Sequence, residues 1–177
     1  MDVDWEKTQA YAVGLGGIYI NLSGRESRGT VQPGEEKAKI KAAIAKGLRE
    51  LLDQEKNSRP VGDVYDTAEA YVGPYVEEAP DLIVGFNPGY RVSWSCATGI
   101  VTESIFQDNE KSWSGDHCMD PPQIPGILFS NQPIGVESPS IMDLAPTVLD
   151  LFGVGVPPYC DGKSMLPASP ERSLDAC

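Results

Sequence analysis

The sequence predicts an α/β fold in which short strands pack against at least one amphipathic helix. Apolar runs bounded by glycine or proline, such as residues 17–22 and 80–86, are typical of buried strands. Residues 35–52 instead carry apolar side chains at helical spacing. The 18 glycines and 15 prolines among 177 residues are many for a helical bundle, and they favour a loop-rich α/β or α+β chain.

The first half of the chain is expected to begin with a strand and a helix. The strand covers residues 17–22, and a charged loop over residues 24–29 follows it. The helix covers residues 35–52, and its acidic first turn complements the helix dipole. The spacing of its apolar stripe predicts packing against the core; the stripe consists of Ile40, Ile44, Leu48, Leu51 and Leu52.

The middle of the chain is expected to add strands to the sheet. Residues 61–71 can form an extended segment that Gly73-Pro74 ends. Residues 80–86 contain a Leu-Ile-Val run, which is typical of a strand covered on both faces. Residues 90–94 are a candidate extension of the sheet.

The last third mixes a polar loop, an apolar run and a helix. Residues 108–125 are polar and irregular, and residues 126–130 form a short apolar run expected to be a strand. A helix is expected to open at Asp143, a plausible N-cap, and to end before Gly153. Residues 154–177 are rich in proline and glycine and are expected to wrap the surface as a tail.

Charge and composition exclude several classes of function. The formal net charge of −12 disfavours binding to a nucleic-acid polymer. The chain has no apolar run of 18 residues, so no membrane span is expected, and residues 1–5 lack the features of a signal peptide. We therefore expect a soluble chain whose compartment is not assigned. The cysteines form no CxxC pair and are expected to be thiols, although a small disulfide-bearing secreted protein is an alternative.

The single histidine limits the chemistry more than any other residue. His117 lies in Trp113-Ser114-Gly115-Asp116-His117-Cys118, in the polar loop before an apolar run. A neutral imidazole suits Zn²⁺ or Mn²⁺, and Asp116 or Asp120 could orient it. A zinc site built from this chain alone would need carboxylates or thiolates to complete its ligands. A surface histidine without function and the histidine of a Ser-His-Asp hydrolase are the alternatives.

Other catalytic motifs are weak or missing. The sequence has no Walker motif, no HExxH and no Gly-x-Ser-x-Gly. Gly14-Leu15-Gly16-Gly17 precedes a strand and does not open a helix, so it does not predict a dinucleotide site. Arg25, Arg28 and Arg91 could bind an anion, although solvated surface arginines are the alternative.

A series of short motifs resembles the latter part of type I phosphodiesterase/nucleotide pyrophosphatase-like proteins, which belong to the alkaline phosphatase superfamily. The matches run in order from Val3 to about Leu166. They include Gly17-Ile18-Tyr19-Ile20-Asn21-Leu22-Ser23-Gly24-Arg25-Glu26, Ala79-Pro80-Asp81-Leu82-Ile83-Val84-Gly85, Gly89-Tyr90-Arg91, Trp113-Ser114-Gly115-Asp116-His117, Pro125-Gly126-Ile127-Leu128-Phe129-Ser130-Asn131, Asp143-Leu144-Ala145-Pro146-Thr147 and Asp161-Gly162-Lys163-Ser164.

This resemblance implies an alkaline-phosphatase-like α/β sandwich, with a large central sheet flanked by helices. It also implies a metal-dependent phosphoric-ester hydrolase with two divalent metal ions, zinc being the expected metal. The substrate would be a small phosphodiester or nucleotide pyrophosphate. By resemblance, His117 in Gly115-Asp116-His117 is a metal ligand, and Asp116 is a candidate to support it.

The chain departs from the family pattern because the nucleophile and the remaining metal ligands lie earlier in the family. We assign no catalytic nucleophile in this chain. Residues 1–177 are expected to be the C-terminal part of one catalytic domain, inactive in isolation, whose partner is an N-terminal half or a second copy bound through exposed sheet. The alternative is a non-catalytic binding module that retains the scaffold.

Overall fold

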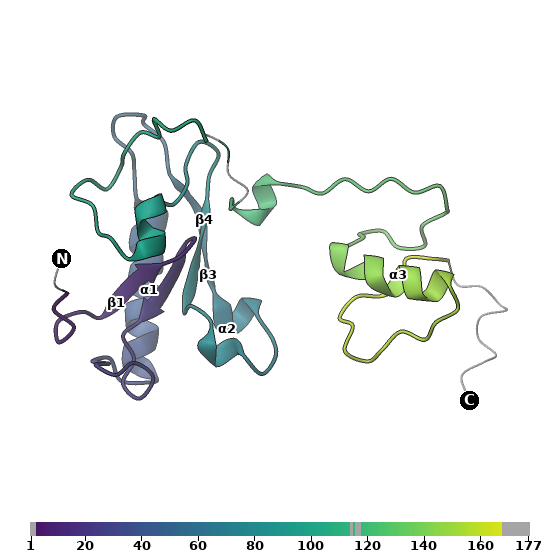
Figure 1. Cartoon of the computed structure of the whole chain (residues 1–177), viewed down its shortest axis with the longest axis horizontal. Coiled ribbons are helices and arrows are strands. Elements are labelled where there is room, and N and C mark those ends of the chain that lie inside the picture. Colours follow the sequence, from purple (N-terminus) through teal and green to yellow (C-terminus); the bar gives the residue numbers. More distant parts are fainter. Residues whose placement is uncertain (1–2, 114, 116–117, 168–177) are drawn as a thin grey trace. The chain divides into compact units, whose positions relative to one another are not determined.

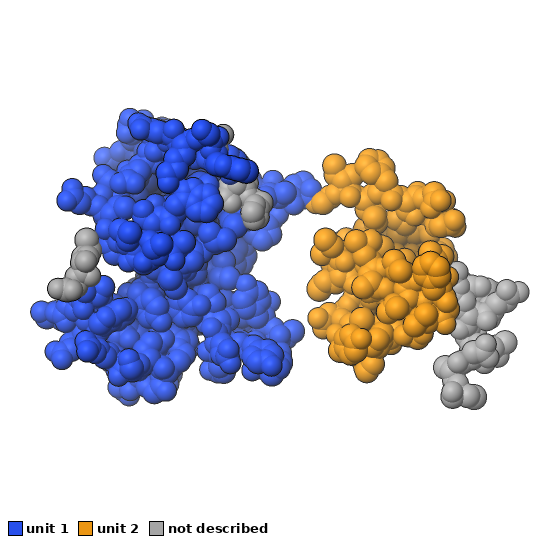
Figure 2. Space-filling model, in the orientation of Figure 1, with its two compact units in different colours: residues 1–125 blue, residues 126–177 orange. Residues whose placement is uncertain are grey.

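The computed structural model describes residues 3–113, 115 and 118–167. The chain forms two compact units, Met1–Pro125 and Gly126–Cys177 (Figure 2). The first unit contains the sheet and the long helix that packs on it, and the second contains a short helix and long loops (Figure 1).

Four strands form one sheet in the order β1-β2-β4-β3, and every neighbouring pair is antiparallel. The strands are β1 (Ala10–Val13), β2 (Gly17–Ile20), β3 (Val61–Asp66) and β4 (Leu82–Phe86). Because β4 lies between β2 and β3, the last strand in sequence becomes a central one. The expected strands at residues 17–22 and 80–86 are thus confirmed, and β1 is a strand that the sequence did not predict.

The β1–β2 hairpin explains the glycines before the predicted strand. Gly14 and Gly16 have φ of 79° and 103°, values that glycine adopts without steric cost. Across the hairpin, Tyr11 and Tyr19 are direct partners, and their rings stack with centroids 5.4 Å apart. Cross-strand aromatic pairs of this kind stabilise a sheet by roughly 0.2–1 kcal/mol each.

Helix α1 (Glu35–Glu50) covers one face of the sheet. It begins with Glu35 and Glu36 in its first turn, as expected, and ends two residues before the predicted Leu52, because Leu51 is extended (φ −58°, ψ 132°). Of its predicted stripe, Ile44 and Leu48 pack on the core, which confirms the core role for these two residues; Leu51 and Leu52 lie beyond the helix, and Leu52 is exposed. The buried core comprises Ala45, Val61, Val64, Leu82 and Val84, with Ile18, Ile44, Leu48 and Phe86 packed against it.

Two expectations for the middle of the chain were wrong in detail. The extended segment ends at Asp66, because the Asp66 side chain accepts a hydrogen bond from the Ala68 N–H and caps the short helix α2 (Thr67–Ala70). The candidate sheet extension at residues 90–94 is a loop that leads into the 3₁₀ helix η2 (Trp94–Thr98). A second 3₁₀ turn, η1 (Val76–Glu78), precedes β4.

The second unit is built around helix α3 (Leu144–Leu151). The 3₁₀ turn η4 (Ile141–Asp143) leads into it, and a capping box between Ser140 and Asp143 closes this start. Gly153, at φ 69°, ends the helix as predicted. The following loop returns to α3, where the Met165 N–H donates to Thr147 Oγ1 at 2.9 Å.

The apolar run at residues 126–130 is not a strand, although its composition predicted one. Among the described residues of the second unit, no strand is present to pair with it. Ile127 and Phe129 are 82% and 91% exposed. The α/β class is therefore confirmed in its coarse form, as a four-stranded antiparallel sheet with a few helices. None of the helices described is long and apolar enough to cross a membrane.

Candidate functional site

The predicted metal ligand His117 and its neighbour Asp116 lie outside the described residues, so their roles stay predictions. The chain is described again from Cys118 onward, where it returns to the sheet of the first unit. The 3₁₀ turn η3 (Pro121–Gln123) follows directly. The contacts that residues 118–123 make with the sheet define the described part of the candidate site.

Asp120 is the point at which the loop attaches to the sheet. Its N–H donates to the Phe86 carbonyl at 3.0 Å, at the end of β4. Its carboxylate Oδ1 accepts a hydrogen bond from the Tyr65 hydroxyl of β3 at 2.5 Å. Its carbonyl accepts from the Gln123 N–H at 2.9 Å, which closes the η3 turn. Asp120 is only 4% exposed, so its carboxylate is turned inward to the strands.

The Asp120 contact changes the acidity of Tyr65. The hydrogen bond to the Asp120 carboxylate, assisted by burial, raises the pKa of Tyr65 to about 12. The neutral phenol is favoured because ionisation would lose the hydrogen bond and place two negative charges side by side. Tyr65 therefore acts as a hydrogen-bond donor at neutral pH.

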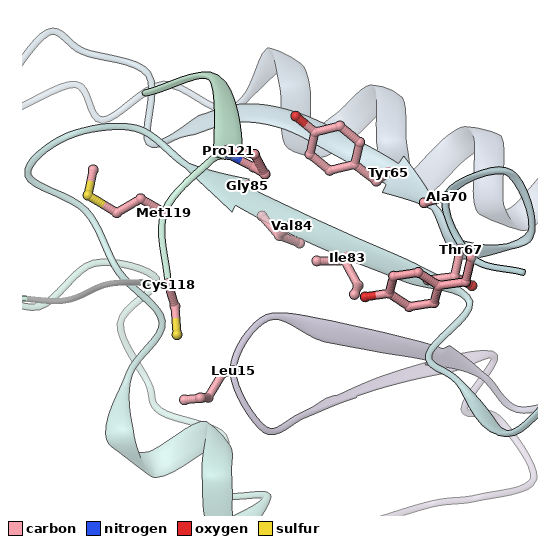
Figure 3. Close-up of a pocket in the computed structure, with 11 residues that line it drawn as sticks. Leu15, Tyr65, Thr67, Ala70, Ile83, Val84, Gly85, Cys118, Met119 and Pro121 are labelled. Atoms are coloured by element: carbon pink, nitrogen blue, oxygen red, sulfur yellow. The ribbon is translucent and has the colours of Figure 1, made fainter. Parts of the chain in front are cut away.

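A pocket of about 260 Å³ lies between this loop and the sheet (Figure 3). Cys118, Met119 and Pro121 from the loop line this pocket, and Leu15 of the β1–β2 turn borders the same space. The remaining lining residues come from β3, β4 and the segment that follows β3; they are Tyr65, Thr67, Ala70, Tyr71, Ile83, Val84 and Gly85.

The pocket offers apolar contacts more than hydrogen bonds. The Tyr65 hydroxyl donates to Asp120, and the Thr67 hydroxyl donates to the Pro80 carbonyl, so both are engaged within the protein. Pockets for whole small-molecule ligands usually measure about 300–1,000 Å³. The space therefore suits a small apolar group and not a complete charged substrate.

Arg25, a candidate anion-binding residue, is already paired. Its guanidinium contacts Asp81 at 2.7 Å and Glu26 at 2.8 Å. Asp81 also accepts from Lys37 Nζ at 2.7 Å and from the Ile20 N–H at 2.7 Å. Burial alone would raise the pKa of Asp81, but the hydrogen bonds from Arg25, Lys37 and Ile20 outweigh it and hold the pKa below its usual range. This cluster therefore joins the sheet to α1 and its flanking loop.

Arg91, a second candidate, stacks on an aromatic ring. Its guanidinium carbon lies 4.1 Å from the centroid of Trp94, a distance at which cation–π attraction is significant. Both residues border an open pocket of about 690 Å³. Lys56 and Asp108, which also line this pocket, form an ion pair at 2.7 Å.

Within residues 3–113, 115 and 118–167, no three His, Cys, Asp or Glu side chains gather into a group that could hold a metal ion. Because His117 and Asp116 lie outside these residues, this finding does not bear on them.

Sequence reasoning named Asp120 only as a possible support for His117 and did not identify Tyr65. One signal was present in the sequence. Gly62 and Gly85 lie inside segments expected to be extended, and a glycine inside a strand often marks a bulge or a close approach by another group. Comparison of the chain with family models, curated proteins and solved structures finds no match in any of the three.

Proposed function

We propose that this chain is the C-terminal portion of an alkaline-phosphatase-like phosphoric-ester hydrolase of the phosphodiesterase/nucleotide pyrophosphatase type. In this proposal His117 is one ligand of a two-metal site, with zinc as the expected metal. The substrate is a small phosphodiester or nucleotide pyrophosphate. The fold would be an α/β sandwich in which the described elements are only one part.

The observation that carries the proposal is the ordered series of motifs around Gly115-Asp116-His117. Each motif alone is short, but they occur in the family order from Val3 to about Leu166. The anchored loop that follows His117 is compatible with the proposal, because a metal ligand needs a firmly held backbone.

The chain would contribute binding and orientation to the reaction. His117 would hold a metal through one ring nitrogen, and the Asp116 carboxylate could accept a hydrogen bond from the other. Two bound cations would supply electrostatic stabilisation of the attacking and leaving oxygens. No residue of this chain is proposed as the nucleophile, which must come from a separate stretch of polypeptide together with the other ligands.

The proposed partner is this separate stretch, which would be the N-terminal half of the same catalytic domain. Exposed apolar side chains in the second unit support this part of the proposal, since soluble surfaces rarely expose many of them together. Ile127, Phe129 and Phe152 are among the most exposed. Without that half, the same surface would favour self-association.

The test is a His117→Ala substitution in a protein that contains both halves. Metal content and hydrolysis of bis(4-nitrophenyl) phosphate would be measured with zinc present. We expect one metal ion fewer per molecule and a loss of rate above about 100-fold, because each metal contributes several kcal/mol to the transition state. Lys111→Ala, an exposed change in the same loop region, is the matched control and should leave both unchanged.

Unchanged metal content and unchanged hydrolysis in His117→Ala would reject the proposal. The isolated chain provides a second test, because it should show negligible hydrolysis. If the combined protein has no phosphoesterase activity either, the non-catalytic binding module becomes the better account.

A further inference from the structure

A second cavity of the first unit, here called the α1-side cavity, lies on the face of the sheet that α1 covers. It measures about 450 Å³ and is bounded by the C-terminal end of α1, by the sheet and by residues 90–106. Ala12 and Ile18, direct partners across the β1–β2 hairpin, line it from the sheet together with Phe86 of β4. Pockets for small-molecule ligands usually measure about 300–1,000 Å³, so this space is large enough for a ligand.

The lining of the α1-side cavity is mostly apolar, and its charge comes from Arg91. Among the described residues that line it, Arg91 is the one whose side chain is charged at neutral pH. The same residue borders the polar pocket of about 690 Å³, so it lies where an apolar space meets a polar one. An apolar cavity with one cation at its edge is complementary to a molecule with an apolar chain and an anionic head. Asp53, Glu55, Asp108 and Glu110 also line the polar pocket, which favours a head small enough to stay against the guanidinium.

Contacts within the first unit hold the segment that carries Arg91. The Tyr90 hydroxyl donates to Asp53 Oδ2 at 2.8 Å, and the Tyr90 ring packs edge-on against Phe106 with centroids 6.3 Å apart. The Arg91 guanidinium carbon lies 4.1 Å from the centroid of Trp94. Stacking on a ring leaves the positive charge of a guanidinium in place, and arginine commonly binds carboxylates. The cation is therefore held at the edge of the cavity before a ligand arrives.

We propose that the α1-side cavity binds an amphiphile with a single aliphatic chain and a carboxylate head, such as a medium-chain fatty acid. The chain lies among Ile18, Leu48 and Phe86, and the carboxylate pairs with the Arg91 guanidinium. Each buried CH₂ group of the chain strengthens binding about fourfold. The proposal does not involve His117 and is independent of the proposed hydrolase activity.

The first test measures the affinity of the full chain for decanoate, kept below the concentration at which it forms micelles. Isothermal titration calorimetry gives the dissociation constants, at about 0.15 M salt to screen the negative net charge of the protein. Decylammonium has the same chain and the opposite charge, and we expect it to bind about tenfold more weakly, because it lacks the charge-assisted contact. Hexanoate should also bind at least about tenfold more weakly, since it buries fewer CH₂ groups.

Substitutions of Arg91 test the contribution of the charge. Arg91→Gln removes the cation and should weaken decanoate binding about tenfold, the loss expected for one charge-assisted contact, without weakening decylammonium binding. Arg91→Lys restores a positive charge and should retain the preference for decanoate over decylammonium.

A substitution in β1 tests the cavity without changing the loop. Ala12→Phe places a ring in the α1-side cavity from an exposed position, and decanoate binding should be lost. Val13→Phe is the matched control, because neighbouring residues of a strand point to opposite faces of the sheet, and it should leave binding unchanged. Far-UV circular dichroism establishes that each variant is folded.

Thiol alkylation locates the bound decanoate. Cys96 lines the α1-side cavity, Cys118 lines the pocket beside Asp120, and Cys160 lies in the second unit. Burial raises the pKa of the Cys96 thiol, so alkylation is followed at mildly alkaline pH by mass spectrometry of the peptides. With decanoate at about ten times its dissociation constant, alkylation of Cys96 should slow about tenfold, while Cys118 and Cys160 react as before.

Several results would overturn the proposal. They are an absence of decanoate binding at millimolar concentration, equal affinities for decanoate and decylammonium, and unaltered binding in a folded Ala12→Phe variant. Protection of Cys118 in place of Cys96, or equal protection of all three thiols, would overturn it as well. None of these measurements involves a metal or phosphoester hydrolysis, so failure of this proposal is distinct from failure of the phosphoesterase proposal.

Discussion

Arg25 and Asp81 form an ion pair at 2.7 Å, although 56 residues separate them in sequence. The Asp81 side chain is only 3% exposed, and Lys37 contacts its second oxygen at 2.7 Å. Arg25 precedes α1, Lys37 lies in its first turns, and Asp81 directly precedes β4. The carboxylate therefore ties the helix and its preceding loop to the central strand of the sheet.

Removal of this carboxylate should strongly destabilise the first unit. Asp81→Ala removes the carboxylate from Lys37 and from the Ile20 N–H and leaves Arg25 with Glu26 as its carboxylate partner, and breaking a buried ion pair in this way costs about 3–5 kcal/mol. Urea unfolding followed by tryptophan fluorescence measures the change. Asp4→Ala breaks the exposed pair with Lys7 at 3.0 Å and should cost no more than about 1 kcal/mol. Equal effects of the two substitutions would contradict the structural role of Asp81.

Acid should weaken the fold through the same carboxylate. The pKa of Asp81 is lowered by its hydrogen bonds, against the opposing effect of burial, relative to an unfolded value of about 3.9. A lowered folded pKa means stability that is complete above the unfolded pKa and is lost as the pH falls through the folded pKa. We expect the Asp81 carboxyl ¹³C signal to titrate below about pH 3.9. Titration at or above that value would show that the pair does not form.

Base should weaken the fold through Tyr65. Its folded pKa of about 12 exceeds the ordinary tyrosine value of 10.0, so its stabilising effect is complete below pH 10 and is lost as the pH rises toward 12. Tyr65→Phe should cost about 1.5–3 kcal/mol at neutral pH, the range for a hydrogen bond to a charged group. It should also reduce the loss of stability between pH 10 and 12. Urea unfolding across this range measures both effects.

Tyr75→Phe serves as the control, because Tyr75 is exposed. It should retain the alkaline loss of stability seen in the unchanged chain. Tyr11, whose pKa is also raised by burial and by Glu26, contributes to that loss in both proteins. Identical alkaline profiles for Tyr65→Phe and Tyr75→Phe would exclude the Tyr65–Asp120 hydrogen bond.

Local patterns predicted those elements whose structure depends on neighbouring residues. The apolar stripe of residues 35–52 predicted α1 to within two residues, and Gly153 marked the end of α3. The predicted N-cap Asp143 was wrong, because Asp143 has helical dihedrals and makes no side-chain cap hydrogen bond to α3; Ser140 is the capping residue, and Asp143 is the third residue of its capping box. The run at residues 126–130 shows the limit of such patterns. Its composition suits a strand, but a strand also requires a partner, which composition does not specify.

The hydrogen bond from Tyr65 to Asp120 could not be predicted from sequence patterns for the same reason, because it also depends on a distant partner. Tyr65 and Asp120 are 55 residues apart, and the close approach of Asp120 to Gly62 and Gly85 depends on the pairing of β3 with β4. Gly62 and Gly85 indicated that another group comes close to the strands, but the sequence did not show that this group is the Asp120 carboxylate. His117, which the sequence singled out by its rarity and its motif, lies outside the described residues, so its role stays a prediction.

The second unit should promote self-association of the isolated chain. Ile127 and Phe129 are almost fully exposed, and burial of one such side chain contributes roughly 1.5–3 kcal/mol. Phe129→Ser should therefore weaken association about 10- to 100-fold, since 1.4 kcal/mol corresponds to a factor of ten. Light scattering across a concentration series measures the change. Val72→Ser, at an exposed valine of the first unit, is the matched control and should leave association unaltered. A monomer that persists at millimolar concentration would show that these side chains need no covering partner.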